Sequence, residues 1–313
     1  MSDDVRFEIA DGVGHVTLDR PRQINALTLP MLAEIGDRLA DWVDADAVER
    51  VHLSGAGERG FCSGADVRAV RTDLAERGEV AAEVFFTIEY AVDALIANYP
   101  KPVRADLFGI TMGGGMGLAA HCDERVVRPD SRLAMPETII GLFPDVGVLW
   151  ELSRAPGELG THLALTGSGV GAADAVLLGL ADRVVGDVSP AVLPGQREWI
   201  DACYVGDDPL AIVQRLEEHP DAEANETAAV LRQRCPFAVA VSLAAIRRAA
   251  TLPDVAAVLG QDLALAVPMV LRPDFSEGVR AQVVDKDRNP TWAPERLEDV
   301  DPAEVAALFR DLG

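Results

Sequence analysis

The sequence lacks the residue patterns that mark several familiar protein classes. Its four cysteines are scattered, without CxxC pairs or the spacing of a disulfide framework, which predicts reduced, structural thiols. The five histidines lack metal-ligand spacing, and no GxSxG elbow, HExxH pair or P-loop lysine motif occurs. Zinc and serine-triad chemistry are therefore disfavoured, and we predict no metal site.

Positive charge and long apolar runs are also scarce. Lys and Arg total 28 against 51 Asp and Glu, so the net charge is -23. This charge repels phosphate backbones and anionic membrane surfaces, which argues against nucleic acid and membranes as partners. No apolar run reaches the roughly 18 to 20 residues of a membrane span, and the N-terminal MSDDVRFEIADG has no apolar secretory region. We expect a soluble, cytoplasmic protein.

The N-terminal part of the chain alternates short strands with helices. VRFEIA and HVTLDR predict two strands joined by a turn at Asp11-Gly12. Residues 29–43 have the apolar spacing of a helix, with Thr28 as its N-cap. Strand, glycine turn and helix then recur along the chain. This order predicts an α/β core over residues 1–196.

The sequence changes character at about residue 197. Alanine-rich and leucine-rich helical patterns dominate from there on, as in PFAVAVSLAAIRRAATL and DVAAVLGQDLALAVPMVL. We therefore predict a helical C-terminal region over residues 197–313. Within it, the acidic segment DAEANET is expected to be a mobile loop.

The strongest chemical signal lies in the middle of the chain. The triplet Gly113–Gly115 precedes Glu137 in MPET and Asp145 in FPDVG. Glycines let backbone N–H groups approach a ligand closely, and two acids can transfer protons or supply a nucleophile. Each acid alone also suits a structural role, because each follows a proline at the start of a turn. Gly117 provides no third acid beside the triplet.

Three motifs together resemble those of the enoyl-CoA hydratase/isomerase, or crotonase, superfamily. FCSGADVR, KPVRADLFGITMGGGMGL and MPETIIGLFPDVG occur in the order characteristic of that superfamily. The last of these, together with the late segment DFSEGVRAQVVDKDRNPTWAP, is similar to the 3-hydroxyisobutyryl-CoA hydrolase branch. The resemblance covers nearly the whole chain. It implies an α/β core, a spiral of stacked ββα units, followed by a helical C-terminal region that helps to cover the site.

The resemblance also implies roles for individual residues. The backbone N–H groups of Ala65 and Gly114 form the oxyanion hole for a thioester carbonyl. Glu137 either attacks the thioester to form a mixed anhydride or activates water for direct attack, and both routes stay open. Asp145 binds or aligns the 3-hydroxyl of the substrate. Together these roles imply hydrolysis of 3-hydroxyisobutyryl-CoA to 3-hydroxyisobutyrate and CoA, a step of valine breakdown.

Coenzyme A is implied as part of the substrate, and no permanently held cofactor is expected. Its phosphates require cations despite the acidic surface, and Arg22 is the first candidate, with Arg68 and Arg71 as others. The resemblance further implies a homo-oligomer, a trimer or a pair of trimers. The other residues implied to contact CoA or substrate are Gln23, Ala26, Ala65, Asp66, Val67 and Gly113.

Two alternative functions remain open. An enoyl-CoA hydratase or isomerase acting on a short-chain acyl-CoA is the first, but hydration relies on two glutamates flanking one water, and Gly117 occupies the position of one of them. That alternative regains support if Asp145 or Asp66 replaces the missing acid. The second is a noncatalytic acyl-CoA-binding protein, against which Glu137 and Asp145 argue together. SGAD and GVLWEL depart from the branch pattern, so other short 3-hydroxyacyl thioesters also remain candidates.

Overall fold

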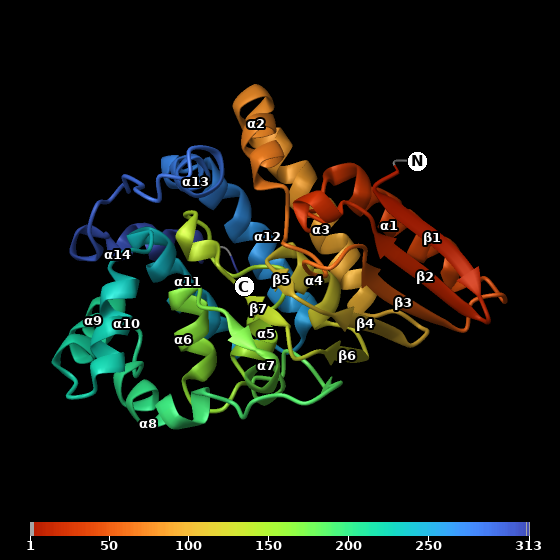
Figure 1. Ribbon diagram of the computed structural model, residues 1–313. Coiled ribbons are helices and arrows are strands. Elements are labelled where there is room, and N and C mark those ends of the chain that lie inside the picture. Colours follow the sequence, from red (N-terminus) through yellow and green to blue (C-terminus); the bar gives the residue numbers. More distant parts are fainter. Residues whose placement is uncertain (1–2, 311, 313) are drawn as a thin grey trace.

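The protein is built on two β-sheets that are joined and covered by helices (Figure 1). A computed structural model describes residues 3–310 and residue 312. The larger sheet has six strands in the order β1-β2-β3-β4-β6-β9, and all neighbours are parallel except β1 and β2. Its strands are β1 (Val5–Ala10), β2 (Val13–Leu18), β3 (Arg50–Gly55), β4 (Val103–Leu107), β6 (Glu124–Val127) and β9 (Arg183–Val184).

The smaller sheet supports the centre of the molecule. It has the order β5-β7-β8, with β5 parallel to β7 and β7 antiparallel to β8. Its short strands are β5 (Ile110–Met112), β7 (Arg132–Ala134) and β8 (Val170–Gly171). Because β5 ends at the glycine triplet, this sheet fixes where the following helix begins.

The predicted N-terminal elements are confirmed. β1 and β2 form the hairpin, and Asp11 and Gly12 at its turn have φ angles of 50° and 76°. The helix predicted at residues 29–43 is α1, and the Thr28 side chain accepts a hydrogen bond from the N–H of Met31 at 3.5 Å. The apolar face of α1 packs against α3 (Glu79–Ala97). Local propensity and capping chemistry therefore agree with the tertiary structure here.

Five more helices of the α/β part connect or flank the strands. α2 stands at one edge of the molecule, and α3 runs through its interior beside α12 (Figure 1). Besides α1 and α3, these helices are α2 (Val67–Arg77), α4 (Gly114–Ala120), α5 (Leu149–Leu152), α6 (Leu159–Thr166) and α7 (Ala172–Leu177), with a 3₁₀ turn, η2, at Glu137–Ile139.

Beyond Val184 the described part of the chain contains helices and turns but no strand. The segment expected to be a mobile acidic loop instead forms the start of α10, because Asp221 caps it by accepting from the N–H of Glu223; that expectation was wrong. The helices are α8 (Leu193–Cys203), α9 (Pro209–Glu218), α10 (Ala222–Leu231), α11 (Pro236–Ala249), α12 (Val255–Leu271), α13 (Pro273–Val279) and α14 (Pro302–Leu308), with a π-helical turn at Arg280–Val284.

Two further sequence expectations concern the core and membranes. The four cysteines are buried and unbridged, in agreement with structural thiols. Within residues 3–310, no single helix is long and apolar enough to cross a membrane. Two sharply bent pairs of segments reach that length and composition only when taken together: α10 with α11, and α12 with Pro273–Val284.

Candidate active site

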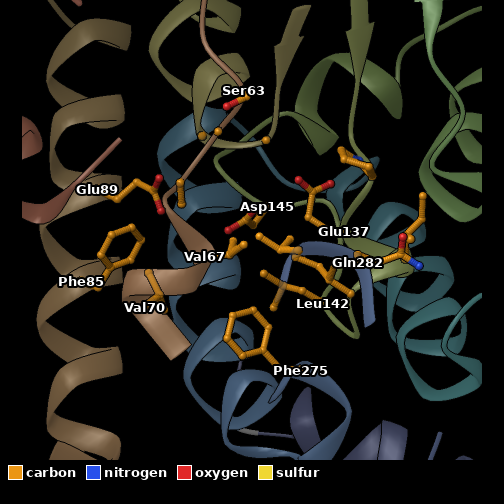
Figure 2. Close-up of a pocket in the computed structure, with 18 of the residues that line it drawn as sticks. Ser63, Val67, Val70, Phe85, Glu89, Glu137, Leu142, Asp145, Phe275 and Gln282 are labelled. Carbon is orange, nitrogen blue, oxygen red and sulfur yellow. The ribbon is translucent and has the colours of Figure 1, made fainter. Parts of the chain in front are cut away.

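A cavity of about 310 Å³ lies where the two parts of the chain meet. One wall comes from α2, α3 and the glycine triplet, and the facing wall comes from residues 136–145 and the segment α13 with its π-helical turn. Figure 2 shows Glu89, Asp145 and Glu137 around the same space, with Phe275 and Leu142 on the apolar side. The cavity therefore combines a few acids with a mostly apolar lining, as small-molecule sites commonly do.

The glycine corner of the cavity brings the two predicted oxyanion donors together. Gly113 has a φ of 51°, which favours glycine, and it ends β5 so that Gly114 begins α4. The first N–H groups of a helix have no intrahelical acceptor, which leaves that of Gly114 for a ligand. A Cβ placed on Gly114 would lie 3.5 Å from the backbone nitrogen of Ala65. The structure thus places both amides at one corner.

A neighbouring loop orients the amide of Ala65. Leu27 bridges this loop, since its N–H donates to Gly64 O at 2.8 Å and its carbonyl accepts from the N–H of Asp66 at 2.7 Å. The first hydrogen bond uses the carbonyl of the Gly64–Ala65 peptide and the second uses the N–H of Asp66. The N–H of Ala65 is accordingly held at the cavity wall, and neither of these hydrogen bonds uses it.

Glu137 lies directly beside the glycine corner. It begins the turn η2, is 6% exposed, and would have its Oε1 only 3.0 Å from a Cβ on Gly113. Its Oε2 has no hydrogen-bond partner among the described residues. Burial, with the charge of Asp145 second, raises its pKa well above the ordinary range. A buried, unpaired carboxyl next to backbone donors is suited to act on a carbonyl carbon.

Asp145 faces the same cavity and has one defined partner. It is 4% exposed, and its Oδ2 accepts a hydrogen bond of 2.6 Å from the hydroxyl of Tyr90 on α3. Burial raises the pKa of Asp145 to about 6, while the hydrogen bond from Tyr90 opposes that rise. The hydrogen bond from Tyr90 therefore favours the charged form of Asp145.

Glu89 is a third cavity acid, which the sequence reasoning missed. It projects from α3, is 2% exposed, and sits so close to the glycine corner that a Cβ on Gly114 would overlap its Oε1. Burial first, and then the charge of Asp145, raise its pKa well above the ordinary range. The available signal was the polar set Glu89, Tyr90 and Asp93 within residues 88–97, the otherwise apolar C-terminal half of this helix.

Some of the residues predicted to contact CoA lie on the cavity wall, and others lie outside it. Ala65, Val67 and Gly113 line it, whereas Arg22 and Gln23 are exposed and Ala26 is buried in the adjoining loop. The Ser63 hydroxyl donates to Gln23 O at 3.1 Å, which brings the two loops together. Figure 2 shows Ser63 and Val67 on this side of the cavity.

Two of the arginines considered for phosphate binding are engaged within the protein. Arg68 donates to Val283 O at 2.7 Å, and Arg71 donates to the hydroxyl of Ser276 at 2.9 Å. Both contacts tie α2 to the segment that follows α12 and so hold the two cavity walls together. Arg22 and Arg68 are both exposed, and Arg22 is the candidate whose guanidinium is not engaged by α13 or its π-helical turn.

Comparison with known proteins identifies the family. The enoyl-CoA hydratase/isomerase family profile matches residues 13–193 and 186–309. The chain belongs to the enoyl-CoA hydratase/isomerase family. It is thus an acyl-CoA-processing enzyme of the crotonase superfamily, in which CoA forms part of the substrate.

Two relatives of this family member share one name. The chain is 34% identical to a mitochondrial 3-hydroxyisobutyryl-CoA hydrolase of Danio rerio, over 99% of this chain and 90% of the relative. The human protein of the same name is 31% identical over 100% and 90%.

The similar solved structures carry other names. A carnitinyl-CoA dehydratase from Mycobacterium thermoresistibile has a TM-score of 0.94 at 39% identity, covering 98% of this chain and 96% of that one. An enoyl-CoA hydratase from Rhodobacter sphaeroides has a TM-score of 0.92 at 34% identity, covering 98% and 97%. These likenesses show the mixed α/β crotonase fold with its helical C-terminal region, while the names leave cleavage and hydration to be decided by the site.

In this crotonase-family enzyme, the position of Gly117 has no room for an acidic side chain. A Cβ on Gly117 would lie 2.8 Å from Asp93 Oδ2 and 2.8 Å from Val146 Cβ. Asp93 is fully buried and does not line the cavity. Asp66, considered earlier as a substitute acid, caps α2 and pairs with Arg20 at 3.2 Å outside the lining. Glu89 and Asp145 are therefore the acids that accompany Glu137.

Within the described residues, no group of three or more His, Cys, Asp or Glu side chains has an arrangement that holds a metal ion. The acids that surround the cavity are carboxyls without cationic partners of their own. The described cavity presents carboxyl groups beside backbone donors.

Proposed function

We propose that the protein is a CoA-thioester hydrolase that converts 3-hydroxyisobutyryl-CoA into 3-hydroxyisobutyrate and CoA. The observation that carries this proposal is the placement of Glu137 beside the Gly113–Gly114 corner, together with the filled space at Gly117. A carboxyl next to an oxyanion site suits attack on a thioester, whereas the second glutamate of a hydratase has no place there. The names of the curated relatives support the same reading.

The proposed chemistry begins with the thioester carbonyl oxygen between the N–H groups of Ala65 and Gly114. In one route Glu137 attacks the carbonyl carbon, the C–S bond breaks, CoA leaves as the thiol after protonation, and water then cleaves the mixed anhydride. In the other route Glu137 takes a proton from water, which attacks directly. Both routes consume one water and yield the acid and the thiol. Each oxyanion donor contributes roughly 2.7–4 kcal/mol to transition-state stabilisation.

The acyl group is selected by the hydroxyl-binding side of the cavity. Tyr90 donates to Asp145 Oδ2, which leaves Oδ1 to accept a hydrogen bond from the 3-hydroxyl of the substrate. Ile139, Ile140 and Leu142 line the cavity near these acids and suit a short branched chain. We place this activity in valine breakdown in the cytoplasm, with the enzyme assembled as a trimer or a pair of trimers.

Hydration is the second candidate because Glu89 and Asp145 supply additional acids around the same cavity. Two carboxyls flanking a water are what addition to a conjugated thioester requires. The solved structures described as a dehydratase and a hydratase give this alternative weight. It differs from hydrolysis in one observable respect, since hydration leaves the C–S bond intact.

Thiol release tests the proposal, with isobutyryl-CoA as the matched ester that lacks only the 3-hydroxyl. We expect rapid release from 3-hydroxyisobutyryl-CoA and release slower by about tenfold or more from isobutyryl-CoA, because Asp145 is then left without its partner. Equal rates for the two esters contradict the role of Asp145. Ester binding without any thiol release or hydration contradicts an enzymatic function and supports a noncatalytic binder.

A further inference from the structure

The residues that follow Asp145 form an unusual turn. Val146 has a φ of 55° and Gly147 has a φ of 76°, so two consecutive residues adopt the left-handed conformation. For a β-branched residue such as Val146 this conformation is a genuine outlier, because its side chain crowds the backbone. Val146 is also buried, at 1% exposure, against Gly117 of α4. Surrounding contacts must therefore keep this turn in place.

A single peptide group in this turn is held on both sides. The carbonyl oxygen of Val146 lies 2.9 Å from Nε2 of His121, and the N–H of Gly147 donates to Oδ2 of Asp262 at 2.8 Å. Because a carbonyl oxygen only accepts, Nε2 of His121 must carry the hydrogen. His121 follows the last residue of α4, whereas Asp262 lies on α12. Two elements far apart in the sequence therefore hydrogen-bond to the same peptide group.

The side chains of His121 and Asp262 are both buried. The His121 side chain is 1% exposed, and Oε1 of Glu151 on α5 lies 3.2 Å from its other ring nitrogen, Nδ1. A Cβ on Gly147 would approach Nε2 of His121 to 2.6 Å, so the ring packs directly against the backbone of this glycine. Asp262 is fully buried. These two contacts to the Val146–Gly147 peptide, from His121 and Asp262, form a clamp that is in place before any substrate binds.

We propose that His121 and Asp262 are positioning residues that hold the Val146–Gly147 peptide and thereby keep Asp145 against Tyr90. This inference rests on the proposed role of Asp145 in thioester cleavage. Once the Val146–Gly147 peptide is released, φ of Val146 returns to the negative values that valine prefers, and this change rotates the preceding Asp145–Val146 peptide. Asp145, the residue immediately before, moves with it and loses its short contact with the Tyr90 hydroxyl.

The charged surroundings give this displacement a recognisable signature. Asp145 is faced by Glu89, Tyr90 and Asp93 from α3, by Glu137 from η2 and by Asp262 from α12. Of these, Tyr90 donates to it. Losing that donor raises the pKa of Asp145 beyond the value of about 6 that burial already gives it. The acidic limb of the rate profile then moves to higher pH.

Matched pairs of variants separate positioning from general destabilisation. His121→Gln keeps an N–H near the place of Nε2, whereas His121→Met removes it; Asp262→Asn keeps an acceptor, whereas Asp262→Leu removes it. We expect the Met and Leu variants to lower kcat for thiol release by about 10- to 100-fold with little change in KM, and to shift the acidic limb upward. The Gln and Asn variants should stay within a few-fold of the wild type with an unshifted limb.

Crystal structures of the same variants give a readout that requires no turnover. The Met and Leu variants should show a rotated Val146–Gly147 peptide and a Tyr90–Asp145 separation beyond hydrogen-bond range. If these variants fold and keep both that contact and the wild-type pH profile, the inference is overturned. Where His121→Met does not fold, His121→Asn, whose amide stops short of the carbonyl, replaces it. A wild type without thiol release refutes the hydrolase proposal alone, because the crystallographic comparison still decides on the clamp.

Discussion

Acidic residues in two regions of this molecule behave in opposite ways. On the surface after α13, Arg280 contacts Glu277, Asp285 and Asp287 at 2.6–2.8 Å, and these contacts lower the pKa of Glu277 and of Asp287. At the cavity, burial raises the pKa of Glu89 and of Glu137, and no cation among the described residues is paired with either.

This difference in pKa shift and pairing indicates which of the carboxyl groups are suited to catalysis. An acid paired with arginine at the surface is ionised throughout the neutral range and has its charge compensated, so its role is structural. A buried acid without a cation exchanges its proton nearer neutral pH, as a general base or nucleophile requires. Burial without a cationic partner at the wall of the cavity, rather than acidity as such, therefore distinguishes the candidate site in a chain with 51 acids.

We expect the largest effect when one acid from each region is replaced and the two variants are compared. Glu137→Gln should lower thiol release by about 10³-fold, because an amide can neither attack the thioester nor accept a proton from water. The matched surface variant, Glu277→Gln, should retain wild-type turnover. Ester binding by both variants should remain, and it can be measured by calorimetry. A comparable loss in the two variants would show that the contrast has no catalytic meaning.

The pH dependence of cleavage is the next prediction. The rate should rise as pH increases through about 6 and above, because Asp145 and Glu137 act as carboxylates and burial raises the pKa of each. Tyr90→Phe removes the hydrogen bond that favours the charged form of Asp145, so its acidic limb should lie at higher pH than that of the wild type. Profiles of kcat/KM for the two proteins provide the measurement, and a downward shift contradicts the assignment.

Stability should respond to the buried acid that does not line the cavity. Asp93 is fully buried, neither of its carboxyl oxygens has a partner among the described residues, and burial raises its pKa well above the ordinary range. A raised folded-state pKa contributes stability at low pH that is lost as pH rises through that value. Asp93→Asn should therefore be more stable than the wild type at about pH 8, by roughly 1–3 kcal/mol, and similar at about pH 5.

Chemical denaturation at the two pH values measures this prediction. Asp73→Asn, on the surface of α2, is the matched control because it is paired with Arg77 in solvent. It should show no comparable pH-dependent gain. A destabilised Asp93→Asn at the higher pH would indicate that the carboxylate has a stabilising partner.

The smallest effect is expected from the surface cluster itself. Asp287→Asn removes one contact with Arg280, but Glu277 and Asp285 remain to pair with that guanidinium. We expect a slight fall in melting temperature that shrinks at high salt, because exposed ion pairs are screened. A large, salt-insensitive fall would place this cluster among the determinants of the fold.

The sequence predicts those parts of the site that reside in contiguous motifs. The glycine triplet, Glu137 and Asp145 are recognisable from local patterns, and the structure places all of them at one cavity. The hairpin and α1 follow from turn and capping residues for the same reason. Local chemistry was misleading only for residues 221–227, where a helix cap outweighs the acidic composition.

The remaining parts depend on contacts between distant segments. Glu89 reaches the glycine corner only because α3 packs beside α4, and Asp262 reaches Gly147 across 115 residues because α12 packs against α3. The engagement of Arg68 by the carbonyl of Val283 likewise joins segments that no local pattern relates. Such pairings follow from packing, so they were not available from residue spacing alone.

The most direct test of the central claim compares cleavage and hydration by one preparation of the wild-type protein. Thiol release from 3-hydroxyisobutyryl-CoA and loss of the conjugated bond of crotonyl-CoA are followed side by side. The account predicts rapid thiol release and weak hydration, because Glu137 lies at the oxyanion corner and the space beside Gly117 is filled. Rapid hydration without thiol release would contradict it and would show that Glu89 or Asp145 serves as the second acid of a hydratase.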